Sequence, residues 1–187
     1  WNVTPDTLLY GNVSTGYKAG VFPTVATSAF SQLVPAVQEE LLAYEVGFKS
    51  TLFDGSLQLN GALFYYDYTD KQLLGAIIDP VFGPLPQLVN VPTSHVQGAE
   101  ISAVWEPMEG LRIAPIVSYA DSEVDTCENA PIVLSGPGCR ADGHYFQFDP
   151  FSQLVDLTGQ QFPSAPKWQA SLDVQYDWAL RDNVRAY

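Results

Sequence analysis

Apolar and polar residues alternate without a break along the segment KWQASLDVQYDW, which covers 167–178. The apolar set is Trp168, Ala170, Leu172, Val174, Tyr176 and Trp178, and the polar set is Gln169, Ser171, Asp173, Gln175 and Asp177. Side chains of a β-strand point to opposite faces with a period of two, whereas a helical period would scatter these residues around a cylinder. The segment is therefore predicted to be a strand with one apolar and one polar face.

The same alternation recurs in five earlier segments, which cover 9–18, 44–53, 57–68, 98–107 and 111–119. In 57–68, LQLNGALFYYDY, the aromatic residues Phe64 and Tyr66 occupy positions where the alternation predicts polar residues. The chain thus has six predicted strands and the start of a seventh at Asn183. Their length of about 10 to 13 residues exceeds the ~5–6 residues typical of globular strands and approaches that of a tilted membrane-crossing strand.

Short and long connections alternate between these strands. The turns after the second, fourth and sixth strands are FDGS, EPMEG and ALRDN, whereas the connections 19–42, 70–89 and 121–166 are long. Tight turns at one end and long loops at the other are typical of outer-membrane barrels. The expected fold is all-β: a portion of an antiparallel up-and-down transmembrane β-barrel, with about six to seven strands, short periplasmic turns and long extracellular loops. A soluble β-sandwich binding module, which also alternates, is the alternative.

Aromatic residues fall at the ends of the apolar stripes. Tyr and Trp combine an apolar body with a polar tip and favour the two water interfaces of a membrane. We therefore expect an aromatic girdle whose outer rim contains Tyr17, Tyr44, Tyr65, Tyr119 and Trp168 and whose inner rim contains Trp105 and Trp178. The opposite face then lines the lumen, and its charged candidates are Glu45, Lys49, Glu100, Arg112, Asp173 and Asp177.

Composition narrows the functional classes. A net charge of −13 with eight basic residues argues against a nucleic-acid partner. No run approaches the ~18 consecutive apolar residues of a transmembrane helix. The chain has no nucleophile elbow, phosphate loop or zinc signature, so we expect no enzyme, no cofactor and no metal site. His95 and His144 have no partner at metal-ligand spacing and are interpreted as solvated loop histidines.

The two cysteines lie in a segment rich in Pro, Gly and acidic residues. Cys127 and Cys139 are twelve positions apart, a spacing that does not match a zinc site. It favours a disulfide that closes a surface loop in an oxidising compartment, with two unrelated thiols as the alternative. We expect this loop to lie outside the cell.

Three motifs resemble TonB-dependent outer-membrane receptors. YEVGFKSTLFDGSLQLNGALFYYDYTDKQ is similar to a Tyr-Glu-x-Gly-x-Lys strand that leads through a short turn into a strand ending in Phe-Tyr-x-Asp-Tyr-x-Asp. NVPTSHVQGAEISAVWEPMEGLRI resembles the family's strand with Gly-x-Glu and the following Pro-x-x-Gly-Leu turn, and LLYGNVSTGYKAG resembles an earlier Gly-Tyr-Lys-x-Gly strand. The motifs occur in the family's order and together cover nearly the whole chain.

This resemblance implies a 22-stranded barrel with an amino-terminal plug, which takes up scarce nutrients such as siderophore–iron complexes with energy relayed from the inner membrane. Residues 1–187 are expected to be part of the barrel domain, from its later strands, with no plug domain present. The implied location is the outer membrane of a Gram-negative bacterium. The implied partners are outer-membrane lipid, the plug, an inner-membrane energy-coupling protein and a small-molecule or metal-chelate ligand. A passive porin-like barrel is the alternative transport function.

The charged lumen candidates have two interpretations. They contact the transported ligand, or they hydrate the channel wall and pair with each other and with the plug. The second interpretation is preferred, because polar side chains are the default on a lumen face.

Overall fold

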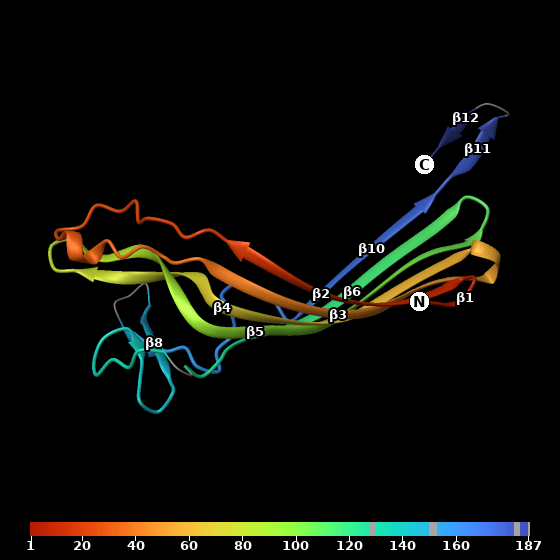
Figure 1. The fold of residues 1–187 in the computed structure, drawn as a ribbon. Helices are drawn as coiled ribbons and strands as arrows, with labels where there is room; N and C mark the ends of the chain where they lie inside the picture. The colour runs from red at the N-terminus through yellow and green to blue at the C-terminus, as the bar shows by residue number, and fades with distance from the viewer. Residues whose placement is uncertain (128–129, 150–152, 182–183, 187) are drawn as a thin grey trace.

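Six long antiparallel strands form one curved wall in the computed structural model, which describes residues 1–127, 130–149, 153–181 and 184–186 (Figure 1). In spatial order they are β2 (Thr7–Lys18), β3 (Glu39–Leu52), β4 (Leu57–Asp79), β5 (Gly83–Met108), β6 (Leu111–Val124) and β10 (Trp168–Tyr176). A short β1 (Asn2–Thr4) pairs with the start of β2. The six predicted strands are confirmed, and within the described residues they form an open sheet rather than a closed barrel.

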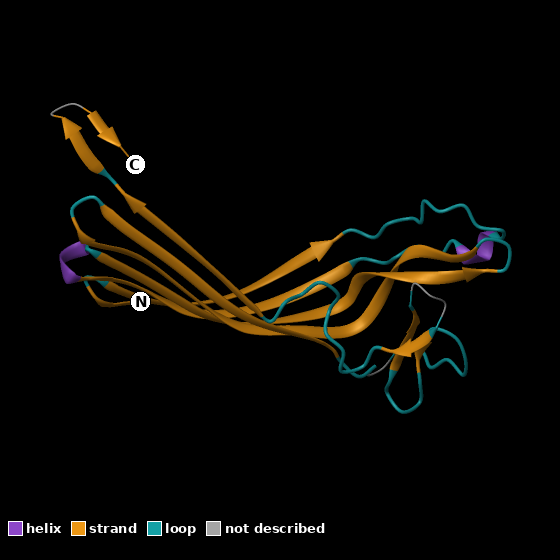
Figure 2. Cartoon of the chain, turned by 180° about the vertical axis from the view of Figure 1, so that it is seen from behind, coloured by secondary structure: helices purple, strands orange, loops and turns teal. Residues whose placement is uncertain are grey.

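The turn end of the wall is built as the sequence predicts. β3 and β4 are joined by a single turn, η2 (Phe53–Gly55), in which Phe53, Asp54 and Gly55 all have positive φ. β5 and β6 are joined at Glu109 and Gly110, and Gly110 has a φ of 84°. A glycine has no Cβ to clash in this conformation, which explains its place in the turn. Both turns lie at the same end of the sheet (Figure 2).

One predicted connection is largely strand. The sequence suggests a long loop over 70–89, but β4 and β5 continue as a paired hairpin up to the Asp79–Gly83 pair. The second strand of this hairpin contains Pro84 and Pro86, and proline lacks the N–H of a ladder bond. They are tolerated here because β6 pairs with β5 only from Ser94 onward, which leaves that side of the extended hairpin as an edge.

The other two long connections are also shorter or more ordered than expected. β3 already begins at Glu39, and the segment before it contains a short helix, η1 (Phe30–Gln32). β6 continues to Val124. The connection after it was expected to be a long loop, but β7 (Gly138–Cys139), β8 (Tyr145–Phe148) and β9 (Leu154–Asp156) form a small sheet within it that touches β4 at Ala76. We call residues 125–166 the cap.

The last strands are β11 (Trp178–Arg181) and β12 (Val184–Ala186), which pair with each other. The ALRDN turn was expected to begin at Ala179, but Ala179 and Arg181 are part of this pairing. Asn183, the expected start of a seventh strand, lies outside the described residues. The part of the chain that the structure describes has no helix long and apolar enough to span a bilayer.

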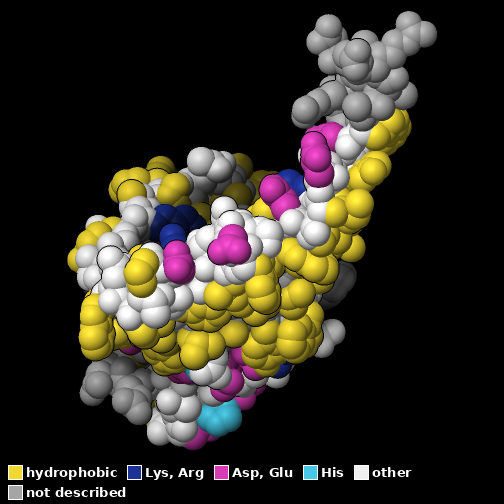
Figure 3. Space-filling model, turned by 90° about the vertical axis from the view of Figure 1, so that its right-hand side faces the viewer, with side chains coloured by type: hydrophobic (Ala, Val, Ile, Leu, Met, Phe, Trp, Pro, Cys, Tyr) yellow, Lys and Arg dark blue, Asp and Glu magenta, His cyan; other side chains and the backbone are white. Residues whose placement is uncertain are grey.

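The wall has two chemically different faces. Cross-strand partners carry the alternation from strand to strand, as in the row Leu9, Phe48, Gly61, Ile101, Val117 and Ala170. Viewed along the strands, hydrophobic side chains gather along the lower side of the wall, and carboxylates gather on the upper side (Figure 3). The apolar side chains are mostly exposed to solvent, including Leu63 at 60% and Leu172 at 67%. The apolar face therefore has no protein partner among the described residues.

Candidate functional site

The charged lumen candidates on the strands share one face. Glu45 on β3 lies opposite Phe64, Lys49 lies opposite Asn60, and Glu100 on β5 lies opposite Ala62. These positions have the parity opposite to that of the apolar row described above. Arg112 and Asp173 have the same parity on β6 and β10, and their side chains form an ion pair at 3.0 Å. This pair is the only direct ion pair between two of the candidates among the described residues.

Asp177 lies just beyond the end of β10. Its backbone N–H donates to the carbonyl oxygen of Gly110, and its carboxylate accepts a hydrogen bond from the amide of Gln175 at 3.2 Å. A Cβ at Gly110 would lie 2.3 Å from the Asp177 carbonyl oxygen. Asp177 thus fastens the end of β10 to the β5–β6 turn, and its place is at the turn end of the wall.

Aromatic rings also lie on the face that carries the charged lumen candidates, at positions where the sequence pattern predicted polar residues. Phe64 and Tyr66 stack with ring centres 4.8 Å apart. The Phe64 ring lies across Gly98, where an added Cβ would come within 2.4 Å of it. The Tyr10 ring covers Gly47 in the same way. In the sequence, the only sign of these rings was that Phe64 and Tyr66 occupy positions of 57–68 where the alternation predicts polar residues. The glycines opposite the rings explain how the rings fit flat against the wall.

The seven girdle candidates lie on the opposite face or at its ends. Tyr44 and Tyr65 are direct cross-strand partners, and Tyr119 packs against Trp168 with ring centres 4.9 Å apart. Tyr17 lies opposite Glu40, and Trp105 lies between Leu57 and Ile113 near the turns. Trp178 stacks with Tyr176 at 5.9 Å. Tyr176 was not among the candidates, although its position in the alternating segment pointed to it.

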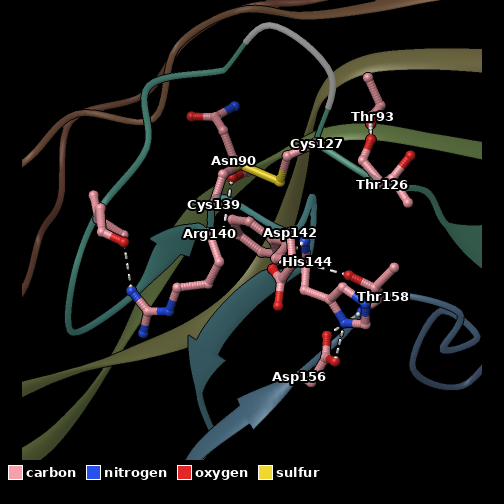
Figure 4. Close-up of a disulfide and its surroundings, with 12 residues drawn as sticks. Asn90, Thr93, Thr126, Cys127, Cys139, Arg140, Asp142, His144, Asp156 and Thr158 are labelled. Atoms are coloured by element: carbon pink, nitrogen blue, oxygen red, sulfur yellow. Dashed lines mark hydrogen bonds and ion pairs between the residues drawn. A yellow bond between two sulfur atoms is a disulfide. The ribbon is translucent and has the colours of Figure 1, made fainter.

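The cap is closed by a disulfide between Cys127 and Cys139, whose Cα atoms are 5.8 Å apart (Figure 4). Cys139 is 3% exposed and belongs to a buried cluster with Val91, Val124 and Tyr145. The Tyr145 hydroxyl donates to the carbonyl oxygen of Asn90 on β5 at 3.0 Å. Burial raises the pKa of Tyr145 to about 12, so this hydroxyl stays a donor. The disulfide therefore closes a ring within the cap, and Tyr145 joins the cap to β5 at the base of the extended hairpin.

Polar contacts hold the small sheet of the cap together. His144 Nδ1 lies 2.5 Å from a carboxylate oxygen of Asp156, and this contact raises the pKa of His144 (Figure 4). Burial alone would raise the pKa of Asp156, but His144 and Thr158 hold it below its usual value. Arg140 donates to the carbonyl oxygens of Val133 and Gly136, which closes the 133–140 segment.

Two charged residues anchor the long connections to the wall. The Lys71 Nζ atom on β4 lies 3.6 Å from the centre of the Tyr68 ring and 3.6 Å from a carboxylate oxygen of Glu39 on β3. The centre of the Phe162 ring, which belongs to the cap, is 5.0 Å from the same atom. Burial lowers the pKa of Lys71, although Glu39 opposes the shift. At the hairpin tip, buried Asp79 accepts hydrogen bonds from the backbone N–H groups of Ser28, Val81 and Phe82. Burial would raise the pKa of Asp79, yet these donors lower it to about 2.

His95 differs from its expected loop environment. It lies within β5, stacks on Tyr65 with ring centres 5.5 Å apart, and has Nδ1 2.7 Å from Asp125. Its cross-strand partners are Asp67 and Glu123. Over the described residues, no group of three or more His, Cys, Asp or Glu side chains is arranged to hold a metal ion.

Comparisons with solved structures find the same wall in receptors. The ferric yersiniabactin uptake receptor FyuA from Yersinia pestis matches 96% of this chain with a TM-score of 0.62 and 20% identity, and the siderophore receptor PiuA from Acinetobacter baumannii matches 93% with 0.58 and 22%. The ferric-catecholate import receptor Fiu from E. coli K12 matches 99% with 0.55 and 14%. In each case this chain spans 22% of the receptor's length. At these identities the likeness shows the fold alone.

A sequence-family model gives the decisive match. The search of curated protein sequences found no match. The model of the TonB dependent receptor-like β-barrel covers residues 1–187. The members of this family and the matched structures are receptors and transporters, not enzymes. The two-faced open sheet, its tight turns at one end and this match over the full sequence have one common explanation: the chain belongs to the β-barrel family of TonB-dependent receptors.

Proposed function

We propose that this chain forms part of the barrel wall of an outer-membrane receptor that takes up a scarce nutrient, such as a siderophore–iron complex, with energy supplied from the inner membrane. The observation that carries the proposal is the family match over residues 1–187. FyuA is a ferric yersiniabactin uptake receptor, PiuA is a siderophore receptor and Fiu is a ferric-catecholate import receptor, which supports an iron chelate as the ligand class. The partners are outer-membrane lipid, a plug domain, an inner-membrane energy-coupling protein and the chelate.

The proposed location is the outer membrane of a Gram-negative bacterium. The exposed apolar face supports it, because large exposed apolar surfaces mark a partner or a membrane. Tyr17, Tyr44, Tyr65, Tyr119 and Trp168 then form the outer rim of the girdle, and Trp105 and Trp178 form the inner rim. The cap and the extended hairpin lie at the loop end, which faces the exterior in barrels of this kind.

The six charged candidates are proposed to line the lumen. Arg112 and Asp173 already neutralise each other, which fits the wall-hydration role better than ligand binding. Glu45, Lys49 and Glu100 have no ion pair among the described residues, so they are the candidates for contact with the plug or the ligand.

The test uses the complete parent protein in a Gram-negative host that lacks its own receptor for the chelate. Cells are supplied with radiolabelled iron as a ferric siderophore, with and without a protonophore that collapses the inner-membrane gradient. The proposal expects uptake that depends on the parent gene and stops when the gradient collapses. Uptake that continues after the collapse identifies a passive barrel, and recovery of the parent in the soluble fraction identifies a soluble binding module.

A further inference from the structure

The apolar face of the wall has a shallow groove of about 490 Å³. It crosses four strands, because its walls are two neighbouring rows of cross-strand partners. One row contains Val46, Leu63 and Ala99, and the other contains Leu9, Phe48, Gly61 and Ile101. The row with the opposite parity lies between them and contributes Tyr10, Gly47, Ala62 and Glu100.

The hollow follows from the size of four side chains. Leu63 lies opposite Ala99, and Gly61 lies opposite Ile101, so these four residues form a square on the face. The small residues Gly61 and Ala99 share one diagonal, and the large residues Leu63 and Ile101 share the other. The Phe48 ring leans over Gly61, where a Cβ would lie 2.5 Å from it. Ala99 therefore forms the floor of the groove, next to the exposed branched side chains of Leu63 and Ile101.

The groove is placed for a membrane lipid. Its side-chain walls are hydrocarbon only, so they offer no hydrogen bond to a polar ligand. Tyr44 and Tyr65 form the next pair of the same face toward the loop end, directly beside Val46 and Leu63. Their polar tips are typical of headgroup level, which puts the groove immediately inside the hydrocarbon region of the outer leaflet.

We propose that this groove binds one acyl chain of an outer-leaflet lipid, with the lipid headgroup beside Tyr44 and Tyr65. The inference rests on the proposed location in the outer membrane. The driving force is shape and not the hydrophobic effect, because bulk lipid is as apolar as the groove. A chain in the groove gains van der Waals contacts on several sides, whereas a chain on a flat face has them on one side.

The experiment compares two alanines of β5 that lie on the same apolar face. Ala99 lines the groove, whereas Ala103, which lies opposite Leu59, does not. The complete parent protein and its Ala99→Phe and Ala103→Phe variants are purified in detergent. They are titrated with lipid A, the acylated glycolipid of the outer leaflet of this membrane, and the lipids retained per protein are counted by native mass spectrometry. If Ala99→Phe does not fold, Ala99→Leu replaces it.

If the groove binds an acyl chain, the parent and Ala103→Phe should retain one more lipid than Ala99→Phe. The Ala99→Phe variant should need at least a tenfold higher lipid concentration to bind that additional lipid. Equal retention in all three proteins overturns the inference, and so does equal loss in both variants. A dimer in the parent that Ala99→Phe dissociates also overturns it, since a second copy would then fill the groove. Failure of iron uptake with normal lipid retention counts against the proposed function alone, and recovery of the parent as a soluble protein overturns both.

Discussion

Replacing Leu172 by Arg tests which face of the wall meets lipid. Leu172 is the middle residue of β10, four positions from both Trp168 and Tyr176. At ~3.3 Å per residue and a tilt of ~40°, each of those aromatic residues lies about 10 Å away along the membrane normal. The apolar band of such barrels is about 25 Å tall, so Leu172 lies close to its midplane.

The expected cost follows from that depth. An arginine on the lipid face at the midplane destabilises a barrel by about 2–4 kcal/mol, and the side chain of Leu172 is 67% exposed on the apolar face. Since 1.4 kcal/mol is a factor of ten, the folding equilibrium constant should fall about 30- to 700-fold. Ser171 lies opposite Ile116 on the other face, where Arg should change the free energy of unfolding by less than about 1 kcal/mol.

The measurement is reversible denaturant unfolding of the complete parent barrel in phospholipid vesicles. Leu172→Ala is the matched control, because it removes the leucine side chain without adding a charge. Equal destabilisation by Leu172→Arg and Ser171→Arg would refute the register and the assignment of the two faces. A larger effect at Ser171 would invert the faces.

Three further changes test the cap and the wall. Intact cells should incorporate a membrane-impermeant thiol reagent at Cys127, the less buried of the two cysteines, only after reduction, and loss of the bond should destabilise the cap by up to about 3 kcal/mol; labelling before reduction would show free thiols. Because the pKa of His144 is raised in the folded cap, its stabilising contact with Asp156 is complete below pH ~6.5 and is lost as the pH rises through the raised value; hydrogen exchange of β8 and β9 should therefore accelerate with pH beyond its intrinsic rate, and His144→Gln should remove that excess. Gly98→Leu should cost about 1–3 kcal/mol in the unfolding assay, because a Cβ there meets the Tyr119 carbonyl oxygen at 2.2 Å, and an unchanged stability would contradict this packing.

The strands of the wall could be predicted because one face is consistently apolar. Along 168–178 every second residue carries that signal, and the structure pairs Trp168–Tyr176 with β6 without a register shift. The extended hairpin was not predicted: 70–89 was interpreted as a long connection, and its Pro84 and Pro86 are compatible with a strand only at an edge. Their effect depends on which strand edge they face, and a single sequence does not contain that information.

The candidate site was predicted unevenly for a similar reason. Parity places Glu45 and Lys49 on one face, but it does not reveal that Phe64 and Tyr66 stack there, since ring placement depends on the glycines of the neighbouring strands. The contacts of Lys71 with Glu39 and Phe162 join residues from three separate segments. No local pattern marks such contacts, because they arise only when β3, β4 and the cap come together in the folded chain.

The open edges of the sheet constrain how the parent barrel is assembled. β2 beyond its short pairing with β1, and β10 along its outer side, present backbone N–H and C=O groups without a strand partner among the described residues. In hydrocarbon each unpaired group costs several kcal/mol, so the wall is unstable in a bilayer until further strands cover both edges. Membrane insertion and barrel closure should therefore occur as one cooperative step, and a half-built wall should be a substrate for insertion machinery and for proteases rather than a stable intermediate.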